Sequence, residues 1–191
     1  MSNLQPSPDF VDIVRQDSER LQALYAVNDM LRKVEAEGLD LDAILPKVLS
    51  VAVQQLAAHD GSIIIVDEHL ELEHGWLENR PAVHASGFLA DIVKNGLAGW
   101  VLRNKQASII NDTRNDSRWL PRKDHQTSKT SWSVICTPFI IRNRPIGAVT
   151  IHKEGANQFD ARDMSLLMAI SSQAASTIEN ACLLANSRRL L

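Results

Sequence analysis

The sequence has 191 residues, enough for one sizeable domain with helical extensions. Hydrophobic residues make up 45% of the chain and charged residues 23%, and the formal net charge is −3. This balance provides no basic excess to neutralise phosphates, so we expect no nucleic-acid partner. No apolar run approaches the roughly 18 residues of a membrane span, so we expect no membrane either. Only two cysteines occur, Cys136 and Cys182, far apart, which predicts a reducing compartment and a cytoplasmic protein.

The first part of the chain predicts one long helix behind a short lead-in. Residues 1–9 contain two prolines and few apolar side chains, which is typical of a disordered terminus. Residues 10–38 predict an N-terminal signalling helix, because apolar residues recur at helical spacing and no proline or glycine interrupts them before the last position. This helix either packs on its own domain or pairs with its copy in a dimer, where an asparagine in the seam fixes the register. Its candidates for dimer contact are Val14, Leu21, Leu24, Asn28 and Leu31.

The middle of the chain alternates short strands and short helices. An aspartate at position 40 or 42 caps a predicted helix, and two strands joined by a tight turn follow it, which makes them antiparallel. In the second of these strands the strict alternation predicts a shared face for Leu70, Leu72, His74 and Trp76. The elements predicted here are a helix to residue 55 or 58, strands at 62–66 and 70–76, short helices at 88–95 and 97–103, and a strand at 107–111.

A long polar loop and three long elements complete the chain. Residues 112–130 lack a period, and a loop of this length in a compact domain is typically functional. Strands are predicted at 131–141 and 146–152, and a helix runs from residue 160 to the last residue. Its apolar seam supplies further candidates for dimer contact: Leu167, Ile170, Ala174, Ala181 and Leu184. The whole pattern predicts an α+β fold, a central antiparallel sheet of about five to six strands flanked by helices, with long N- and C-terminal helices.

Several segments, in order and at fitting distances, resemble the GAF domain family. One is the glycine-flanked helix that starts at Gly96, followed by a strand and by Asp112-x-x-x-Asp116-x-Arg118-Trp119. Others are the strand at 131–141 with its internal proline, the return strand Arg-Pro-Ile-Gly-Ala-Val at 144–149, and the closing helix at 173–181. The likeness implies a GAF/PAS-like domain over residues 39–185. Residues 186–191 are then expected to end the last helix and lead to an output domain beyond Leu191.

The resemblance implies a non-catalytic sensory domain of a cytoplasmic signal-transduction protein, such as one associated with a histidine kinase. GAF domains typically bind a small ligand and relay its presence through the terminal helices of a homodimer. The alternative is a dimerisation or protein-interaction module that binds no ligand. The sequence names neither the ligand nor a cofactor, because a fold does not fix the ligand.

More specific family functions fit the sequence less well. In cyclic-nucleotide-binding members the family has an Asn-Lys pair, a Phe and an Asp-Glu pair, whereas this chain has His152-Lys153, Phe159 and Asp163-Met164. A bilin photoreceptor needs a tethering cysteine, and a free methionine sulfoxide reductase needs several cysteines close together. Cys136 and Cys182 instead fall inside a predicted strand and a predicted helix, as small core residues do.

The candidate ligand site combines aromatic side chains with a few polar anchors. The six histidines show no HxH or HExxH spacing, so no metal site is predicted. His74 is either a hydrogen-bonded residue near a strand end or a pocket or haem ligand. The candidates for the ligand pocket are His74, Trp76, Phe88, Trp100, Arg114, Arg118, Trp119, His125 and Trp132. If the domain is a ligand sensor, these side chains pack around the ligand. If it binds no ligand, they fill the core and the loops.

Overall fold

The computed structural model describes residues 18, 21–22, 24–33, 40–77, 80–81, 86–120 and 130–189. Residues 24–33 are helical. The other elements follow in chain order: α2 (Leu41–Gln55), β1 (Asp60–Val66), β2 (Leu72–Leu77), β3 (Arg80–Pro81), α3 (Ser86–Asn95), α4 (Leu97–Asn104), β4 (Ser108–Ile110), the short helix η2 (Thr113–Asn115), β5 (Trp132–Ile141), β6 (Arg144–Glu154) and α5 (Ala161–Arg189).

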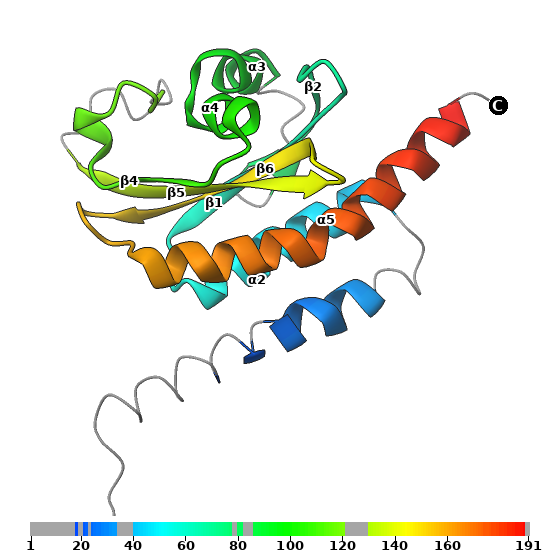
Figure 1. Ribbon diagram of the computed structural model, residues 1–191, viewed down its shortest axis with the longest axis horizontal. Coiled ribbons are helices and arrows are strands. Elements are labelled where there is room, and N and C mark those ends of the chain that lie inside the picture. The colour runs from blue at the N-terminus through cyan, green and yellow to red at the C-terminus, as the bar shows by residue number, and fades with distance from the viewer. Residues whose placement is uncertain are drawn as a thin grey trace, which may run out of the picture.

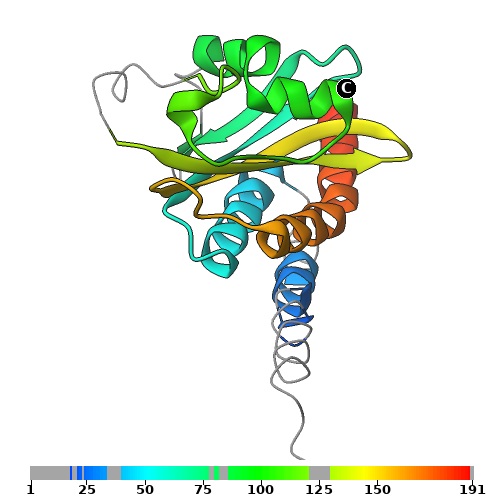
Figure 2. The same ribbon diagram turned by 60° about the vertical axis from the view of Figure 1, so that its left-hand side comes forward.

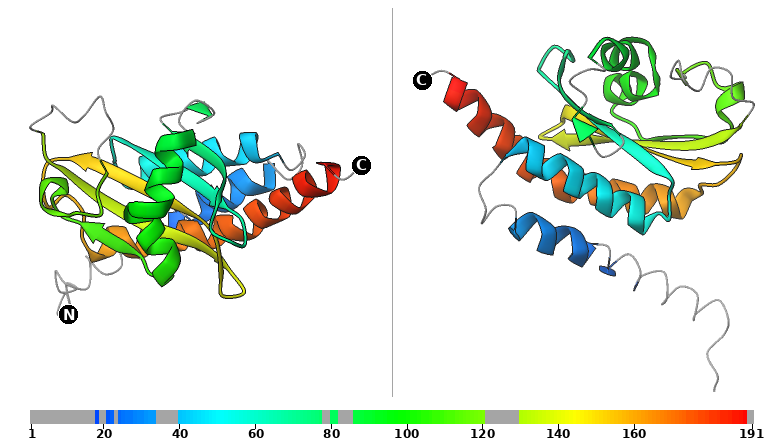
Figure 3. Two further views of the ribbon diagram at one scale, coloured as in Figure 1. Left: turned by 90° about the horizontal axis from the view of Figure 1, so that it is seen from above. Right: turned by 180° about the vertical axis from the view of Figure 1, so that it is seen from behind.

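The fold is three layers deep, with one sheet in the middle. All strand pairs are antiparallel, and the strand order is β3-β2-β1-β6-β5-β4. Helices α3 and α4 cover one face of the sheet, and α2 and α5 run antiparallel to each other across the opposite face (Figures 1 and 2). The views in Figure 3 show α4 lying across the strands from above and α2 beside α5 from behind. The predicted α+β class is confirmed.

The protein has two hydrophobic cores, one on each face of the sheet, because successive side chains of a strand point to opposite faces. On the α2/α5 face, Ile63 and Ile65 of β1 and Ile135 of β5 pack against the two helices. On the α3/α4 face, the neighbouring positions Ile64 of β1 and Val134 of β5 pack against α3 and α4. Strand side chains alternate between faces, so a sheet covered on both sides reads as a continuous apolar run.

Carboxylates fix the starts of the two helices beneath the sheet. The Asp40 side chain accepts a hydrogen bond from the Asp42 N–H at 3.2 Å and caps α2. At α5, Asp160 accepts from the Asp163 N–H at 3.0 Å while Asp163 accepts from the Asp160 N–H at 3.0 Å. This reciprocal arrangement satisfies N–H groups that a helix leaves without internal partners. Both helices begin where the sequence predicts.

The second strand departs from the predicted alternation. The register of β1 and β2 pairs Ile65 with His74 and then Val66 with Leu72, so an irregularity lies between them. Leu72 therefore packs with the α3/α4 core, whereas Trp76 belongs to the α2/α5 core. A single extra residue moves later side chains to the other face. The prediction that Leu70, Leu72, His74 and Trp76 share one face is wrong.

The terminal helices use most of their predicted seam inside the chain itself. Leu167, Ile170, Ala174 and Ala181 are at most 1% exposed and Leu31 is 5% exposed, all within the α2/α5 core. Leu24 is half-buried, Asn28 is exposed, and Val14 lies outside the described residues. Leu21 is 54% exposed and Leu184 is 41% exposed. Among the described positions of the predicted seam, Leu21, Asn28 and Leu184 are therefore the most accessible to a partner.

Candidate functional site

A cavity of about 620 Å³ lies between the sheet and the helices α3 and α4. This volume falls within the range that drug-sized ligands occupy in proteins. The sheet side of the cavity is lined by His59, Asp60, Gly61, Ser62, Leu77, Trp132, Thr150 and His152. The helix side is lined by Phe88, Ile92, Gly96, Leu97 and Ala98, and the segment after β4 adds Thr113, Arg114, Arg118, Trp119 and Leu120, with Thr130 beyond it.

The cavity exists because the sheet carries small polar side chains at paired positions. Ser62 of β1 pairs with Thr150 of β6, and both line the cavity. Farther along the same two strands, Ile64 pairs with Ala148, and both belong to the α3/α4 core. Where the side chains change from apolar to short and polar, the space between the sheet and α3/α4 is left unfilled.

Two imidazoles and two indoles form an aromatic cluster on the sheet side of the cavity. The ring centroids of His59 and Trp132 lie 5.3 Å apart and those of Trp132 and His152 lie 5.5 Å apart, both edge to face. Trp119 adds a tilted contact to His152 at 6.5 Å. Backbone pairing supports the cluster, since the His59 N–H donates to the His152 carbonyl at 3.1 Å. The geometry suits planar apolar rings.

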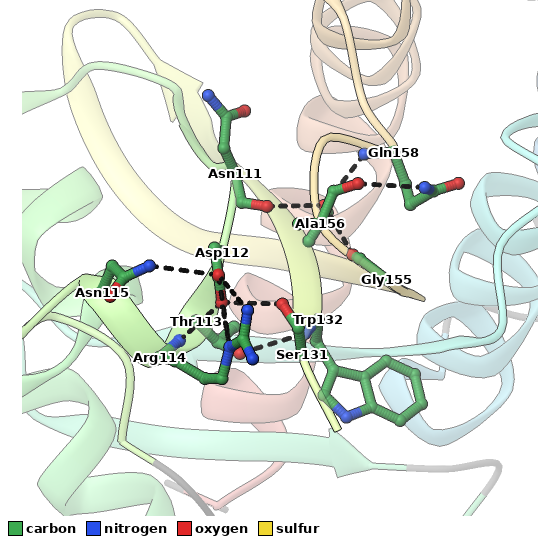
Figure 4. A network of polar contacts seen from close by, with 11 residues as sticks. Asn111, Asp112, Thr113, Arg114, Asn115, Ser131, Trp132, Gly155, Ala156 and Gln158 are labelled. Atoms are coloured by element: carbon green, nitrogen blue, oxygen red, sulfur yellow. Dashed lines mark hydrogen bonds and ion pairs between the residues drawn. The ribbon is translucent and has the colours of Figure 1, made fainter. Parts of the chain in front are cut away.

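Arg114, on the cavity wall, is paired with its neighbour Asp112 (Figure 4). The guanidinium donates to the Asp112 carboxylate from Nε at 3.0 Å and from Nη2 at 2.7 Å. The Ser131 hydroxyl donates to the same carboxylate at 2.7 Å. These hydrogen bonds, that from Arg114 first, hold the pKa of the Asp112 carboxyl well below its usual range. The pair closes the loop between β4 and η2.

Arg118 repeats this arrangement with Asp116. Its guanidinium donates to the Asp116 carboxylate from Nε at 2.9 Å and from Nη2 at 2.7 Å, and this pairing lowers the pKa of Asp116. Nη1 donates to the Ser108 hydroxyl at 3.0 Å, and the guanidinium carbon lies 4.8 Å from the Trp100 ring centroid. Arg118 is therefore held from three sides, and the Asp-x-x-x-Asp-x-Arg motif shapes the wall of the cavity.

A hydrogen-bonded junction connects this wall to the segment before α5. The buried Ser133 hydroxyl shares its one hydrogen between the carbonyl oxygens of Asn111 and Gly155, each 2.9 Å away, and it accepts from the Gln158 N–H at 2.9 Å. The Gly155 N–H donates to the Ser131 carbonyl at 2.8 Å. In Figure 4, Asn111, Gly155 and Gln158 converge beside Asp112 and Ser131. The loop after β4 and the loop after β6 therefore share hydrogen-bond partners.

The structure brings together five of the predicted pocket residues and separates the others. Phe88, Arg114, Arg118, Trp119 and Trp132 line the cavity. Trp100 lies behind Arg118 and packs on the α3/α4 core without lining the cavity.

Of the remaining three predicted residues, the two that the structure describes lie away from the cavity. Trp76 packs in the α2/α5 core, and His74 pairs with Ile65, whose side chain lies in that same core. These two candidates therefore do not line this cavity, because their pairing with Ile63 and Ile65 places them on the α2/α5 side of the sheet. His125 lies outside the described residues.

Sequence reasoning missed His59 and His152. His152 shares the face of Thr150 on β6 at a spacing of two residues, a signal that the alternation of the strand contained. His59 follows the end of α2 and precedes β1, where no periodicity points to a site.

Neither cysteine lines the cavity, although Cys136 lies directly beneath the lining residue Thr150. Burial raises the pKa of the Cys136 thiol to about 12 and that of the Cys182 thiol to about 11. Thiols held protonated in this way are weak nucleophiles. In the described ranges, no three His, Cys, Asp or Glu side chains are grouped to hold a metal ion. No helix in those ranges combines the length and apolar character that a membrane span needs.

Comparison with known proteins identifies relatives of this chain. It is 23% identical over 169 residues to the "Probable 3',5'-cyclic phosphodiesterase pde-5" of Caenorhabditis elegans, covering 83% of this chain and 23% of that protein. The chain thus spans about a quarter of the length of this curated relative.

Solved structures share the fold at low sequence identity. The GAF domain of a phosphoenolpyruvate-protein phosphotransferase from Acinetobacter superposes with a TM-score of 0.66 at 16% identity, covering 87% of this chain and 97% of that one. The corresponding domain from Coxiella burnetii gives 0.64 at 18% identity, with coverages of 85% and 98%. The free methionine-R-sulfoxide reductase of Neisseria meningitidis gives 0.60 at 16% identity, with coverages of 83% and 89%.

A family model described as GAF domain matches residues 38–179, from the residues just before α2 to most of α5. This range contains the α3/α4 core, most of the α2/α5 core, the cavity and the junction at Ser133. The chain belongs to the GAF domain family.

Proposed function

We propose that this GAF domain is a non-catalytic sensor that binds a small molecule in the cavity between the sheet and α3/α4. The observation that carries the proposal is the cavity itself, about 620 Å³ in volume and lined by aromatic and apolar side chains with a few polar groups. Ligand sites are typically concave, mostly apolar and anchored by a small number of polar groups.

The same geometry supports a relay from the cavity to α5. Trp132 of β5 lines the cavity, and Ile135, three residues farther along the same strand, packs in the α2/α5 core. The Ser133 hydroxyl also ties the loop after β4 to Gly155 and Gln158, just before α5 begins. A ligand that binds one arrangement of this wall better than another would shift the start of α5 accordingly.

We further propose that the relay ends in a homodimer formed through the terminal helices, within a cytoplasmic signalling protein that carries a separate output domain. Exposed apolar side chains remain on these helices at Leu21, Tyr25, Met168, Leu183 and Leu184. Large exposed apolar side chains grouped on helices are typical of surfaces that contact a partner.

The proposal does not include catalysis. A thiol-based reductase needs an accessible thiolate, whereas Cys136 is fully buried beneath Thr150, whose hydroxyl donates to its sulfur at 3.3 Å. The cyclic-nucleotide motif is only partial in the sequence. Lys153 contacts the Phe159 ring at 4.6 Å, which provides a structural role for these two residues.

The experiment that tests the proposal is a thermal-shift screen of the purified chain over nucleotides, haem, nitrate and aromatic acids, with native mass spectrometry of the untreated protein. A ligand at a hundredfold excess over its dissociation constant stabilises the fold by about 2.7 kcal/mol. We expect a hit whose shift is lost in Trp119→Leu, which alters the cavity, and retained in Tyr25→Leu, which removes an exposed aromatic ring elsewhere. No hit and no co-purifying mass would favour the alternative, a dimerisation module without a ligand.

A further inference from the structure

We infer that the cavity takes a planar aromatic or heteroaromatic molecule that carries a hydrogen-bond acceptor and no net negative charge. This inference rests on the proposed function and names the chemical class of its ligand. Three features of the described lining carry it: the aromatic cluster, the pairing of both arginines, and the first turn of α4.

The aromatic cluster favours a flat ring. Trp132 meets the imidazoles of His59 and His152 edge to face at 5.3 Å and 5.5 Å, and Trp119 tilts toward His152 at 6.5 Å. All four side chains line the cavity, and Phe88 lines it from α3. A flat ring in the cavity would add to such a cluster, since aromatic groups prefer edge-to-face or offset contacts.

The two arginines in the described lining are already paired with carboxylates. Arg114 is bound by the Asp112 carboxylate at 2.7 Å and Arg118 by the Asp116 carboxylate at 2.7 Å. Nη1 of Arg118 is directed to the Ser108 hydroxyl at 3.0 Å, and the face of its guanidinium rests on Trp100. An anionic ligand would have to compete with two carboxylates of the same chain, each only two positions before the arginine that it pairs with.

The described charges of the wall also disfavour an anion. Each of its two guanidinium groups is already matched by one carboxylate. A ligand carboxylate or phosphate buried here would lose hydration without gaining a full counter-charge, and a buried charge without a partner is strongly disfavoured.

The first turn of α4 favours an uncharged acceptor. Gly96, Leu97 and Ala98 line the cavity, and no side chain caps this helix. The first N–H groups of a helix have no partner within it, and a carbonyl or ring nitrogen of a ligand can accept from them. The partial charge at a helix N-terminus does not replace the full counter-charge that a carboxylate requires.

The test compares matched pairs of probes by calorimetry at about pH 8, above the usual range of imidazole titration. The pairs are nicotinamide and nicotinate, benzamide and benzoate, and naphthamide and naphthoate, which share a ring and differ in charge. We expect each amide to bind at least tenfold more tightly than its carboxylate. We also expect Trp132→Leu to weaken the amides at least tenfold.

Charge-release variants make the test specific. Asp112→Asn removes the charge that neutralises Arg114, so the affinity of each carboxylate relative to that of its amide should rise at least fivefold. Asp116→Asn makes the same change for Arg118 and serves if Asp112→Asn does not fold, as judged by circular dichroism.

The outcomes separate the ligand class from the proposed function. Carboxylates that bind the wild type as tightly as the amides would overturn the class and leave ligand binding standing. A preference for amides that neither charge-release variant reduces would also overturn it. Amides that fail while another compound of the thermal-shift screen binds would refute the class alone, and failure of every compound would refute both.

Discussion

Asp112 shows how one side chain of the motif organises the wall of the cavity. Its carboxylate accepts from the Arg114 guanidinium, from the Arg114 N–H at 3.0 Å and from the Ser131 hydroxyl at 2.7 Å. The residue therefore connects the two ends of the polar loop at 112–130. In the proposed site it would act on a ligand indirectly, by setting where Arg114 lies and how much charge Arg114 presents.

The pH dependence of stability should report this role. The pKa of Asp112 in the folded chain lies below the value of about 3.9 for an unfolded aspartate. Its contribution is therefore complete above about pH 4 and is lost as the pH falls further, toward the folded-state pKa. Urea unfolding should give a smaller difference in free energy between wild type and Asp112→Asn at pH 3 than at pH 7. An unchanged difference would mean that the carboxylate is not held by Arg114 and Ser131.

A buried hydroxyl pair beneath the sheet allows a second prediction. Thr137 of β5 and Ser171 of α5 lie 2.6 Å apart, and Ser171 donates to the Leu167 carbonyl at 2.8 Å, which leaves Thr137 as the donor between the two. Ser171→Ala leaves the Thr137 hydroxyl buried without this acceptor, so we expect a loss of about 1–3 kcal/mol in the free energy of unfolding.

The matched controls lie next to the pair. Adding Thr137→Val to Ser171→Ala should recover part of the loss, because both polar groups are then removed together. Ser172→Ala, at the exposed neighbouring position, should stay within about 0.5 kcal/mol of wild type. A double variant as unstable as the sum of the single variants would argue against a direct contact.

Among single residues, the sequence predicted the motif residues of the cavity lining better than the two histidines on the sheet side. Arg114, Arg118 and Trp119 stand out because they occupy a motif with fixed spacing. His59 and His152 do not, because tertiary pairing of the end of α2 with β6 brings them together. No local pattern encodes such a meeting.

At the scale of elements, the main difficulty for prediction is which face of the sheet each strand side chain occupies. The helices α2 and α5 could be predicted from period and capping, and β5 from its long apolar run. The face of each β2 side chain could not, because the Asp67 carboxylate accepts from the N–H groups of His69 and Glu71 at 2.8 Å each and holds a turn that shifts the register. The short edge strand β3 lies where the sequence suggests only loop.

Close approach of β1 and β6 predicts a strong effect at Gly147. A Cβ placed there would lie 2.3 Å from the Ile64 carbonyl oxygen and 2.9 Å from Ile65 Cδ1, so the central strands would have to move apart. We expect Gly147→Ala to lower the free energy of unfolding by about 1–3 kcal/mol, as overpacking does. Chemical denaturation provides the measurement.

Gly87 offers the same substitution without the clash. A Cβ at this position in α3 would meet no atom within 4 Å, and alanine is the better helix former. Gly87→Ala should therefore be neutral or stabilising by up to about 1 kcal/mol. Equal losses in the two variants would contradict the strand packing described here.

At the scale of the whole molecule, the first helix has one face packed on the chain's own core and one face exposed to solvent. Residues 24–33 use Val27 and Leu31 to pack against the α2/α5 core, so this helix is in part an intramolecular element, as one of the two predicted alternatives has it. Its neighbour Tyr25 is 72% exposed and remains available to a second chain. The proposed dimer would therefore join the outer face of this helix, with the inner face already buried.

Sedimentation tests that arrangement. Tyr25→Asp should shift the chain toward monomer, because a charge in an apolar contact between helices loses hydration without a partner. Gln106→Asp makes the same change of charge at an exposed position after α4, on the other side of the sheet, and should leave the association unchanged. Two variants that sediment alike would place the contact elsewhere.

The central claim is that a small molecule binds between the sheet and α3/α4, and the four tryptophans test it directly. Trp119 and Trp132 line the cavity, Trp100 lies behind its wall, and Trp76 packs on the opposite face of the sheet. Their indole N–H signals, assigned by single Trp→Phe variants, can be followed by NMR during titration with a compound that raises the melting temperature. We predict that the signals of Trp119 and Trp132 move most and saturate together, while that of Trp76 moves least. A saturable shift confined to Trp76, or no shift at Trp119 and Trp132, would contradict the claim.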